Sequence, residues 1–445
     1  MLIVIVGGGK VGFSIADMLS KEQHDVVIID DNKEKIAILE DRLDVKVIHG
    51  NAASTAVLES AGISRAKLLL AVTESDEVNM MICLLGKQAG VEFTVARVGN
   101  PEYLEEKSSG ASFLSGIDLI INPEIIAAET IIKLIGAPEA LDVMYYADNR
   151  IIVLELPITE KIPVNGIRID QLSSKLPYVI LAIIRDGKVT IPSGSDQLWK
   201  GDIIYLLAKT DEMPRIENIF GMERKKVQRV MIMGGGRTGG HLAKLLRKKD
   251  YSLKIIEKDF NRCQKLAEEH HNVLVINGDA TDLDLLKQEG AGKVDVFISV
   301  TDDDRVNLLV CVIAKQLGAK RTISMVRRQD YADIYKNCGI DIGLCSKTMA
   351  ANAIYKYIKN SQNLLSFTML RKEDISRLDF ELTPQSKIAG RKLKGIALPK
   401  GAIIASVIRG GKIIITRGNI QFLPADKVTV FCLPGISDQV IKLFR

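Results

Sequence analysis

Two glycine-rich runs have the composition of a phosphate-binding turn, and each directly follows a short apolar segment. The glycines that carry the pattern are Gly7, Gly9 and Gly12 in the first run and Gly234, Gly236 and Gly239 in the second. In a GxGxxG turn, the first glycine permits a tight bend and the second lets backbone N–H groups approach a pyrophosphate. The third allows the following helix to pack closely on the strand, with its N-terminus facing the phosphates. The sequence therefore predicts two dinucleotide-binding turns.

An acidic residue follows each turn at the same distance. Asp30 lies 18 positions after Gly12, and Glu257 lies 18 positions after Gly239. A carboxylate at the end of the second strand accepts hydrogen bonds from ribose hydroxyls and repels a 2′-phosphate, which favours NAD(H) or an adenosine nucleotide over NADP(H). The residues that follow are Asp31 and Lys258, which leave the preference between NAD(H) and NADP(H) open at that position. Two full fingerprints at identical spacing disfavour the alternative of two degenerate folds without a ligand.

Other chemistry finds little support in the sequence. There is no GxxxxGK[ST] or GxSxG motif, no CxxC pair and no HExxH spacing, so neither a metal site nor a nucleophilic triad is expected. The acidic run Asp302 to Asp304 is explained by capping of a helix. A tandem NAD-dependent oxidoreductase remains the alternative, but no large substrate domain follows either glycine turn. We therefore expect a non-enzymatic protein.

The elements that position these residues occur twice. Gly7 and Gly234 are 227 positions apart, Gly50 and Gly278 are 228 apart, and Arg185 and Arg409 are 224 apart. Each half alternates apolar strands with helices, which indicates βαβ crossovers and a parallel sheet. The expected strands are 2–6, 26–29, 45–48, 68–72 and 93–98 in the first half and 230–233, 253–256, 273–276, 294–300 and 321–326 in the second. The predicted fold class is α/β, with two tandem Rossmann-like sheets, each followed by a small β-rich α+β domain.

The small domains are predicted from hairpin signals. Strands 179–184 and 188–191 flank Asp186-Gly187, and strands 403–408 and 413–415 flank Gly410-Gly411. The expected domains are 1–135 and 228–358, which bind nucleotide, and 138–221 and 362–445, which are β-rich.

Composition and charge restrict the remaining possibilities. With 60 basic and 55 acidic residues in 445, the net charge of +5 gives little support for a nucleic-acid partner. The basic cluster Arg224-Lys225-Lys226 is expected to be a solvated linker, with contact to a partner or an acidic membrane surface as the alternative. No apolar run reaches the length of a membrane-spanning helix, and no export signal is present, so we expect a cytoplasmic protein.

Taken together, these motifs resemble the TrkA family, the cytoplasmic regulatory subunits of bacterial Trk potassium uptake systems. Proteins of this family are built from two tandem RCK units, each a KTN domain followed by a TrkA-C domain. The resemblance covers essentially the whole chain. It rests on GGGKVG with Asp30, Gly50-Asn51-Ala52, residues 73–79 and 96–103, and on GGGRTG with Glu257, residues 278–281 and 301–304.

The resemblance implies NAD(H), or ATP or ADP, bound in both clefts. It also implies a homo-oligomer, a dimer or tetramer that forms a ring, with a Trk-type potassium-conducting membrane protein as partner. The residues implied to contact nucleotide in the first site are Gly7, Gly8, Gly9, Lys10, Val11, Gly12, Asp30, Asn51, Ala52, Thr73, Glu74 and Arg97. Those of the second are Gly234, Gly235, Gly236, Arg237, Thr238, Gly239, Glu257, Asp279, Ala280, Thr301 and Asp302.

Two departures from the family pattern affect this prediction. Asn51 stands where an acid is more usual, and Arg97 corresponds to Met325 in the second copy. The two sites are therefore expected to differ in affinity or in ligand. A nucleotide-binding scaffold for some other complex is the third reading that the sequence leaves open.

Overall fold

The computed structural model describes residues 1–21, 24–100, 103, 116–137, 139–160, 162–172, 177–220, 227–247, 251–328, 330–361, 368–370 and 375–444. The basic cluster Arg224 to Lys226 and the boundary at Pro138 lie outside them. The chain divides into two compact units. Residues 1–132 and 228–355 form the first unit, and residues 133–227 and 356–445 form the second. Among the described residues, no helix combines the length and apolar character needed to cross a membrane.

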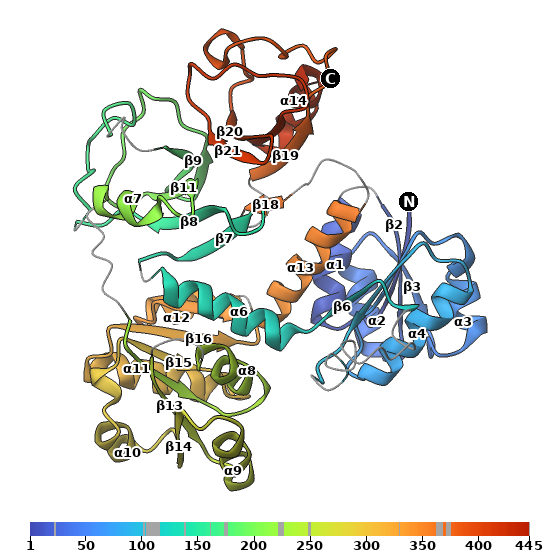
Figure 1. Cartoon of the computed structure of the whole chain (residues 1–445). Helices are drawn as coiled ribbons and strands as arrows, with labels where there is room; N and C mark the ends of the chain where they lie inside the picture. The colour runs from blue at the N-terminus through green and yellow to red at the C-terminus, as the bar shows by residue number, and fades with distance from the viewer. Residues whose placement is uncertain are drawn as a thin grey trace. The chain divides into compact units, whose positions relative to one another are not determined.

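The first half begins with a sheet of six parallel strands (Figure 1). Its strand order is β3-β2-β1-β4-β5-β6. The strands are β1 (Leu2–Val6), β2 (Asp25–Asp30), β3 (Lys46–His49), β4 (Leu68–Ala71), β5 (Phe93–Arg97) and β6 (Leu119–Ile121). The helices are α1 (Lys10–Lys21), α2 (Lys33–Arg42), α3 (Thr55–Ser60), α4 (Asp76–Gln88) and α6 (Pro123–Gly136). The order reverses beside β1, which is the switch point at which parallel α/β sheets bind ligands.

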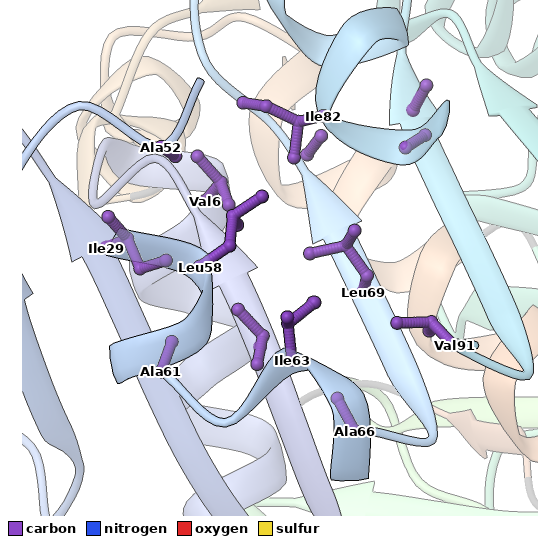
Figure 2. Close-up of a cluster of buried hydrophobic side chains, with 14 of the residues drawn as sticks. Val6, Ile29, Ala52, Leu58, Ala61, Ile63, Ala66, Leu69, Ile82 and Val91 are labelled. Carbon is purple, nitrogen blue, oxygen red and sulfur yellow. The ribbon is translucent and has the colours of Figure 1, made fainter. Parts of the chain in front are cut away.

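The strands alternate buried side chains between two faces of the sheet. Val6, Ile29 and Leu69 point to one face, where they pack with Leu58 of α3 and Ile82 of α4 (Figure 2). Helix α2 begins at a defined cap, because the Asn32 side chain accepts hydrogen bonds from the amides of the first turn. These contacts fix the position at which β1 and β2 end, and therefore the position of the glycine turn.

The second half repeats this sheet in the order β14-β13-β12-β15-β16-β17. Its strands are β12 (Arg229–Met233), β13 (Ser252–Glu257), β14 (Val273–Asn277), β15 (Val296–Ser299), β16 (Arg321–Val326) and β17 (Ile342–Cys345). Its helices are α8 (Arg237–Leu246), α9 (Phe260–Glu269), α10 (Leu283–Gln288), α11 (Asp304–Leu317), α12 (Asp330–Asn337) and α13 (Ser346–Ser361). All its strand pairs are parallel. The predicted fold class is confirmed.

Each parallel sheet has six strands, one more than the five that the sequence pattern predicts. Strands β6 and β17 have only three and four residues, and each pairs with a single neighbour at the sheet edge. An apolar run this short cannot be distinguished from the start of the following helix by periodicity. The sequence therefore does not predict β6 and β17, whose place at the sheet edge depends on pairing in the folded chain.

The second unit contains two antiparallel sheets, ordered β10-β9-β11-β8-β7 and β18-β19-β22-β20-β21. The first consists of β7 (Asp142–Tyr146), β8 (Ile151–Pro157), β9 (Tyr178–Arg185), β10 (Lys188–Thr190) and β11 (Ile203–Lys209), followed by α7 (Met213–Ile219). The second consists of β18 (Thr368–Leu370), β19 (Ile375–Glu381), β20 (Ala402–Arg409), β21 (Lys412–Ile415) and β22 (Lys427–Cys432), followed by α14 (Ser437–Phe444). Both predicted hairpins are present, and Gly187 and Gly411 have positive φ, as such tight turns require.

The two antiparallel sheets share one hydrophobic core. Tyr146 and Tyr205 of the first sheet belong to the same buried cluster as Ile375 and Phe431 of the second. The guanidinium of Arg377 lies 4.3 Å from the centre of the Tyr146 ring, which is cation–π distance. The copies of the small domain are therefore packed as one body.

Candidate functional site

The first glycine turn leaves space only where a ligand would approach. Gly7 has φ +103°, and a Cβ there would lie 3.0 Å from the amide nitrogen of Thr73. A Cβ at Gly12 would lie 1.9 Å from the carbonyl oxygen of Gly7, which is a severe overlap. At Gly9, by contrast, a Cβ would meet no atom within 4 Å. Gly7 and Gly12 are thus required by the fold, whereas Gly9 opens onto free space.

The second turn has the same geometry. Gly234 has φ +98°, and a Cβ there would lie 3.1 Å from the amide nitrogen of Thr301. A Cβ at Gly239 would lie 2.0 Å from the carbonyl oxygen of Gly234, and one at Gly236 would meet nothing within 4 Å. Gly236 is the N-cap of α8, so the open space lies at a helix N-terminus, where anions are stabilised.

A buried carboxylate ties each turn to the end of the second strand. The amide of Gly8 donates to Asp30 Oδ2 at 2.6 Å, and the amide of Asn32 donates to Asp30 Oδ1 at 2.8 Å. In the second copy, Gly235 donates to Glu257 Oε2 at 2.6 Å and Asp259 donates to Oε1 at 2.8 Å. Each carboxylate oxygen keeps lone-pair capacity for a further donor such as a ribose hydroxyl.

A fully buried asparagine organises the loop across from each glycine turn. Asn79 Oδ1 accepts hydrogen bonds from the amide (2.8 Å) and hydroxyl (2.6 Å) of Thr73. Its Nδ2 donates to the carbonyl oxygens of Thr73 (3.1 Å) and Arg97 (2.8 Å). The side chain therefore joins the ends of β4 and β5, which hold two of the predicted ligand-contact residues.

Asn307 repeats this arrangement in the second copy. It bonds the amide and hydroxyl of Thr301 at 2.9 and 2.7 Å, and it donates to the carbonyls of Thr301 and Met325 at 3.0 and 3.2 Å. Neither asparagine is among the residues predicted from the sequence to form the sites. Their equivalent places in the two repeats were the available signal, but a buried polar role cannot be separated from a surface one by sequence alone.

Arg97 and Met325 make the two sites chemically different. Arg97 Nη1 donates to the carbonyl of Thr73 at 3.2 Å, while its Nε is buried and makes no hydrogen bond with the described residues. Met325 is buried and apolar. The first site therefore has a cation beside Thr73, whereas the second has an apolar side chain at the equivalent position.

Acidic side chains near both clefts are engaged in shaping loops. Asp76 accepts from the amides of Gly99 at 2.9 Å and Asn100 at 2.7 Å. Asp303 caps α11 by accepting from the amide of Arg305, and Asp304 accepts from the amide of Arg327. The capping explanation for this acidic run therefore applies to Asp303. Among the described residues, no group of three or more His, Cys, Asp or Glu side chains could hold a metal ion.

The structure brings most predicted residues of the second site to one cleft of about 1650 Å³. The predicted residues that line it are Gly234, Gly235, Gly236, Arg237, Thr238, Glu257, Asp279, Ala280, Thr301 and Asp302. Gly239 is buried beneath the turn instead. Asp279 accepts hydrogen bonds from the amide and hydroxyl of Thr281, which hold the pKa of its carboxyl below the usual range.

The remaining predicted residues of the first site lie around its glycine turn and strand ends. Lys10 and Val11 begin α1, the former exposed and the latter buried. Asn51 is exposed and bonds the amide of Ala53, Ala52 is buried, and Glu74 is exposed just after β4.

Family models match both repeats of the chain. The TrkA-N domain matches residues 3–123 and 230–345, and the TrkA-C domain matches residues 153–221 and 378–445. The chain is 34% identical over 453 residues to the Trk system potassium uptake protein TrkA homolog 1 of Methanosarcina mazei, covering 100% of both chains. It is also 34% identical over 455 residues to the Trk system potassium uptake protein TrkA of Azorhizobium caulinodans, covering 100% of this chain and 99% of the other.

Solved structures share the fold at lower identity. The crystal structure of the GsuK RCK domain superposes with a TM-score of 0.63 at 18% identity, covering 99% of this chain and 94% of that one. The GsuK channel bound to NAD has a TM-score of 0.63 at 19% identity, covering 99% of this chain and 78% of that one. These likenesses concern the architecture.

Proposed function

The chain belongs to the TrkA family of Trk system potassium uptake proteins, and from that premise we propose that it is a nucleotide-sensing regulatory subunit. In this proposal the two parallel-sheet modules bind adenine nucleotides, and binding controls a Trk-type potassium-conducting membrane protein. The observation that carries the proposal is the duplicated turn, in which Gly9 and Gly236 face open space while their neighbouring glycines are required by packing.

The ligand proposed for the first cleft is NAD(H), with ATP or ADP as further ligands of the same turn. Asp30 supports a free ribose, because a 2′-phosphate beside its carboxylate would be repelled. The N-terminus of α1 and the positive charge of Arg97, whose Nη1 bonds the carbonyl of Thr73, support a diphosphate. A related RCK channel, GsuK, has been solved with NAD and with ADP, which accords with either ligand.

We place regulation, rather than catalysis, at these clefts. The polar groups described around the first turn, those of Asp30, Asn79 and Asp76, are bonded to backbone amides or to loop residues. Such bonds hold the loops in place, and Asp30 keeps lone-pair capacity only for a further donor such as a ribose hydroxyl. A hydride transfer would also need a second body to place the acceptor, and each module is followed instead by a small β-rich domain.

The proposed assembly is a homo-oligomeric ring, a dimer or tetramer, docked at the inner face of the membrane through its partner. The proposed domains are 1–135, 138–221, 228–358 and 362–445. A ligand shifts such an assembly only by binding one state better than the other. Moving a pore from about 1% to 99% open takes about 5.5 kcal/mol of discrimination, and several sites can share it at roughly 1–3 kcal/mol each.

Binding and co-purification test this proposal. Calorimetric titration of NADH, NAD, ATP and ADP into the purified chain should give saturable binding to both modules. The chain should also co-purify with a Trk-type membrane protein in detergent. Absence of nucleotide binding would overturn the sensing role, and NADH turnover with an added acceptor would favour an oxidoreductase.

A further inference from the structure

The two clefts differ in the charge of the helices that flank their glycine turns. Among the described residues, eight basic and seven acidic side chains line the second cleft. Five of the basic ones lie on or directly beside α8 and α9: Lys244, Arg247, Lys258, Arg262 and Lys265. At the same offset of 227 residues the first half has Asp17, Ser20, Asp31, Lys35 and Ile38. The basic set of the second cleft is therefore replaced by one cation and two acids in the first.

This basic set is here called the cationic annex. Lys258 Nζ lies 3.3 Å from Asp279, and Lys265 Nζ lies 3.9 Å from Glu269. Arg247 Nη1 donates to the backbone carbonyl of Glu269 at 3.2 Å. The guanidinium of Arg262 makes no hydrogen bond or ion pair with any described residue.

A buried histidine lies beside the annex. His270 lines the same cleft and leaves its Nδ1 without a hydrogen bond among the described residues. Burial, and then the charge of Arg247, lower the pKa of His270 despite the adjacent carboxylate of Glu269. The neutral imidazole therefore offers a polar atom to a ligand in this cleft.

The annex begins beside the ribose position. Lys258 directly follows Glu257, and Arg262 lies in the first turn of α9, whose cap is Asp259. Asp30 and Glu257 each accept two backbone N–H bonds in the same way, so the difference between the two clefts lies in the residues that follow these carboxylates. An anionic substituent on the ribose hydroxyls would meet Lys258 and Arg262 here. The first half has Asp31 and Lys35 at these positions, and Lys35 Nζ lies 4.0 Å from the Asp30 carboxylate.

We propose that the second cleft takes an adenine nucleotide phosphorylated on its ribose, of the NADP(H) type, while the first takes the unphosphorylated form. The inference rests on the proposed function, since it assumes that both clefts bind adenine nucleotides. It replaces, for the second cleft only, the preference for NAD(H) that Glu257 alone predicts. The two modules of the chain would then respond to two different nucleotides.

Calorimetry on the full chain with a single open cleft tests the proposal. In a Gly9→Leu chain, which blocks the first turn, NADPH should bind at least about 10-fold more tightly than NADH. Lys258→Gln and Arg262→Gln should each reduce NADPH affinity about 10-fold and leave NADH unchanged. Lys287→Gln removes an exposed cation of α10 outside the cleft and serves as the matched control, with no effect on either ligand.

Results that would overturn the NADP(H) proposal can be distinguished from results that would overturn the proposed nucleotide-sensing function. Equal or tighter binding of NADH in the Gly9→Leu chain overturns the proposal, and so does binding of NADPH that ignores Lys258 and Arg262. Binding of anionic phospholipid vesicles through these two residues, with no nucleotide preference, would reassign the annex to a membrane surface. The nucleotide-sensing role fails separately, if the Gly236→Leu chain with its open first cleft binds no nucleotide either.

Discussion

Gly9→Leu should abolish nucleotide binding to the first cleft while leaving the fold intact. Because a Cβ at Gly9 meets nothing within 4 Å, the leucine side chain would project into the space that the phosphates need. A charge-assisted hydrogen bond contributes about 1.5–3 kcal/mol, so losing two amide–phosphate bonds costs about 3–6 kcal/mol. Affinity should therefore fall about 10²- to 10⁴-fold.

Gly12→Ala supplies the matched comparison. Its Cβ would lie 1.9 Å from the Gly7 carbonyl oxygen, so the backbone must move. Such overpacking costs roughly 1–3 kcal/mol or more, whereas leucine in place of glycine at a helix start costs about 1 kcal/mol. Gly12→Ala should thus lower thermal stability clearly more than Gly9→Leu, although alanine is the smaller side chain.

Both quantities are measured in a Gly236→Leu background, so that only the first cleft binds. Calorimetry with NADH gives the affinity, and thermal unfolding gives the stability. If Gly9→Leu binds NADH as the parent does, the phosphates do not occupy the space at Gly9. If Gly9→Leu unfolds as readily as Gly12→Ala, any loss of binding reflects loss of fold instead.

Three further perturbations follow from the described contacts. Asn79→Leu removes the hydrogen-bond partners of buried backbone groups and should destabilise the first module by on the order of 3 kcal/mol, measured as faster amide hydrogen exchange in that module. Asn307→Leu should have the same effect on the second module alone. Asp30→Asn should weaken NADH binding at the first cleft by about 1.5–3 kcal/mol in calorimetry and reduce the bias against NADPH; unchanged selectivity would contradict the ribose assignment. Burial raises the pKa of Asp426, but its hydrogen bonds to Arg409 and a backbone amide outweigh that and hold it below the usual value. This carboxylate therefore stabilises the second unit above about pH 4, and the contribution is lost as pH falls through its lowered pKa. Urea unfolding monitored by tryptophan fluorescence should show that acid-side loss, and Arg409→Gln should flatten it.

The sequence predicted the elements that repeat with a strong periodic signal. Paired apolar strands, glycine turns and the acids Asp30 and Glu257 each obey a local rule of spacing, so the parallel sheets and both hairpins could be expected. Strand β6 was missed because its three residues, Leu119 to Ile121, are too few for a period. Its place at the sheet edge depends on pairing with β5.

Other features depend on contacts between distant residues. Asn79 reaches Arg97, and Arg377 stacks on Tyr146, and no local pattern encodes either contact. The cationic annex is likewise a property of two helices brought together. Lys244 and Arg262 lie on separate segments of the chain, so no local sequence pattern predicts that they line one cleft.

Potassium flux through the partner tests directly whether nucleotide binding to this chain controls transport. Vesicles carrying a Trk-type membrane protein would be loaded with this chain, and flux would be recorded as NADH, NAD, ATP and ADP are varied. We predict that flux depends on nucleotide with the wild-type chain and loses that dependence in a chain carrying both Gly9→Leu and Gly236→Leu. Flux that rises on adding the protein but ignores nucleotide in both chains would contradict the account, and it would leave the protein a scaffold.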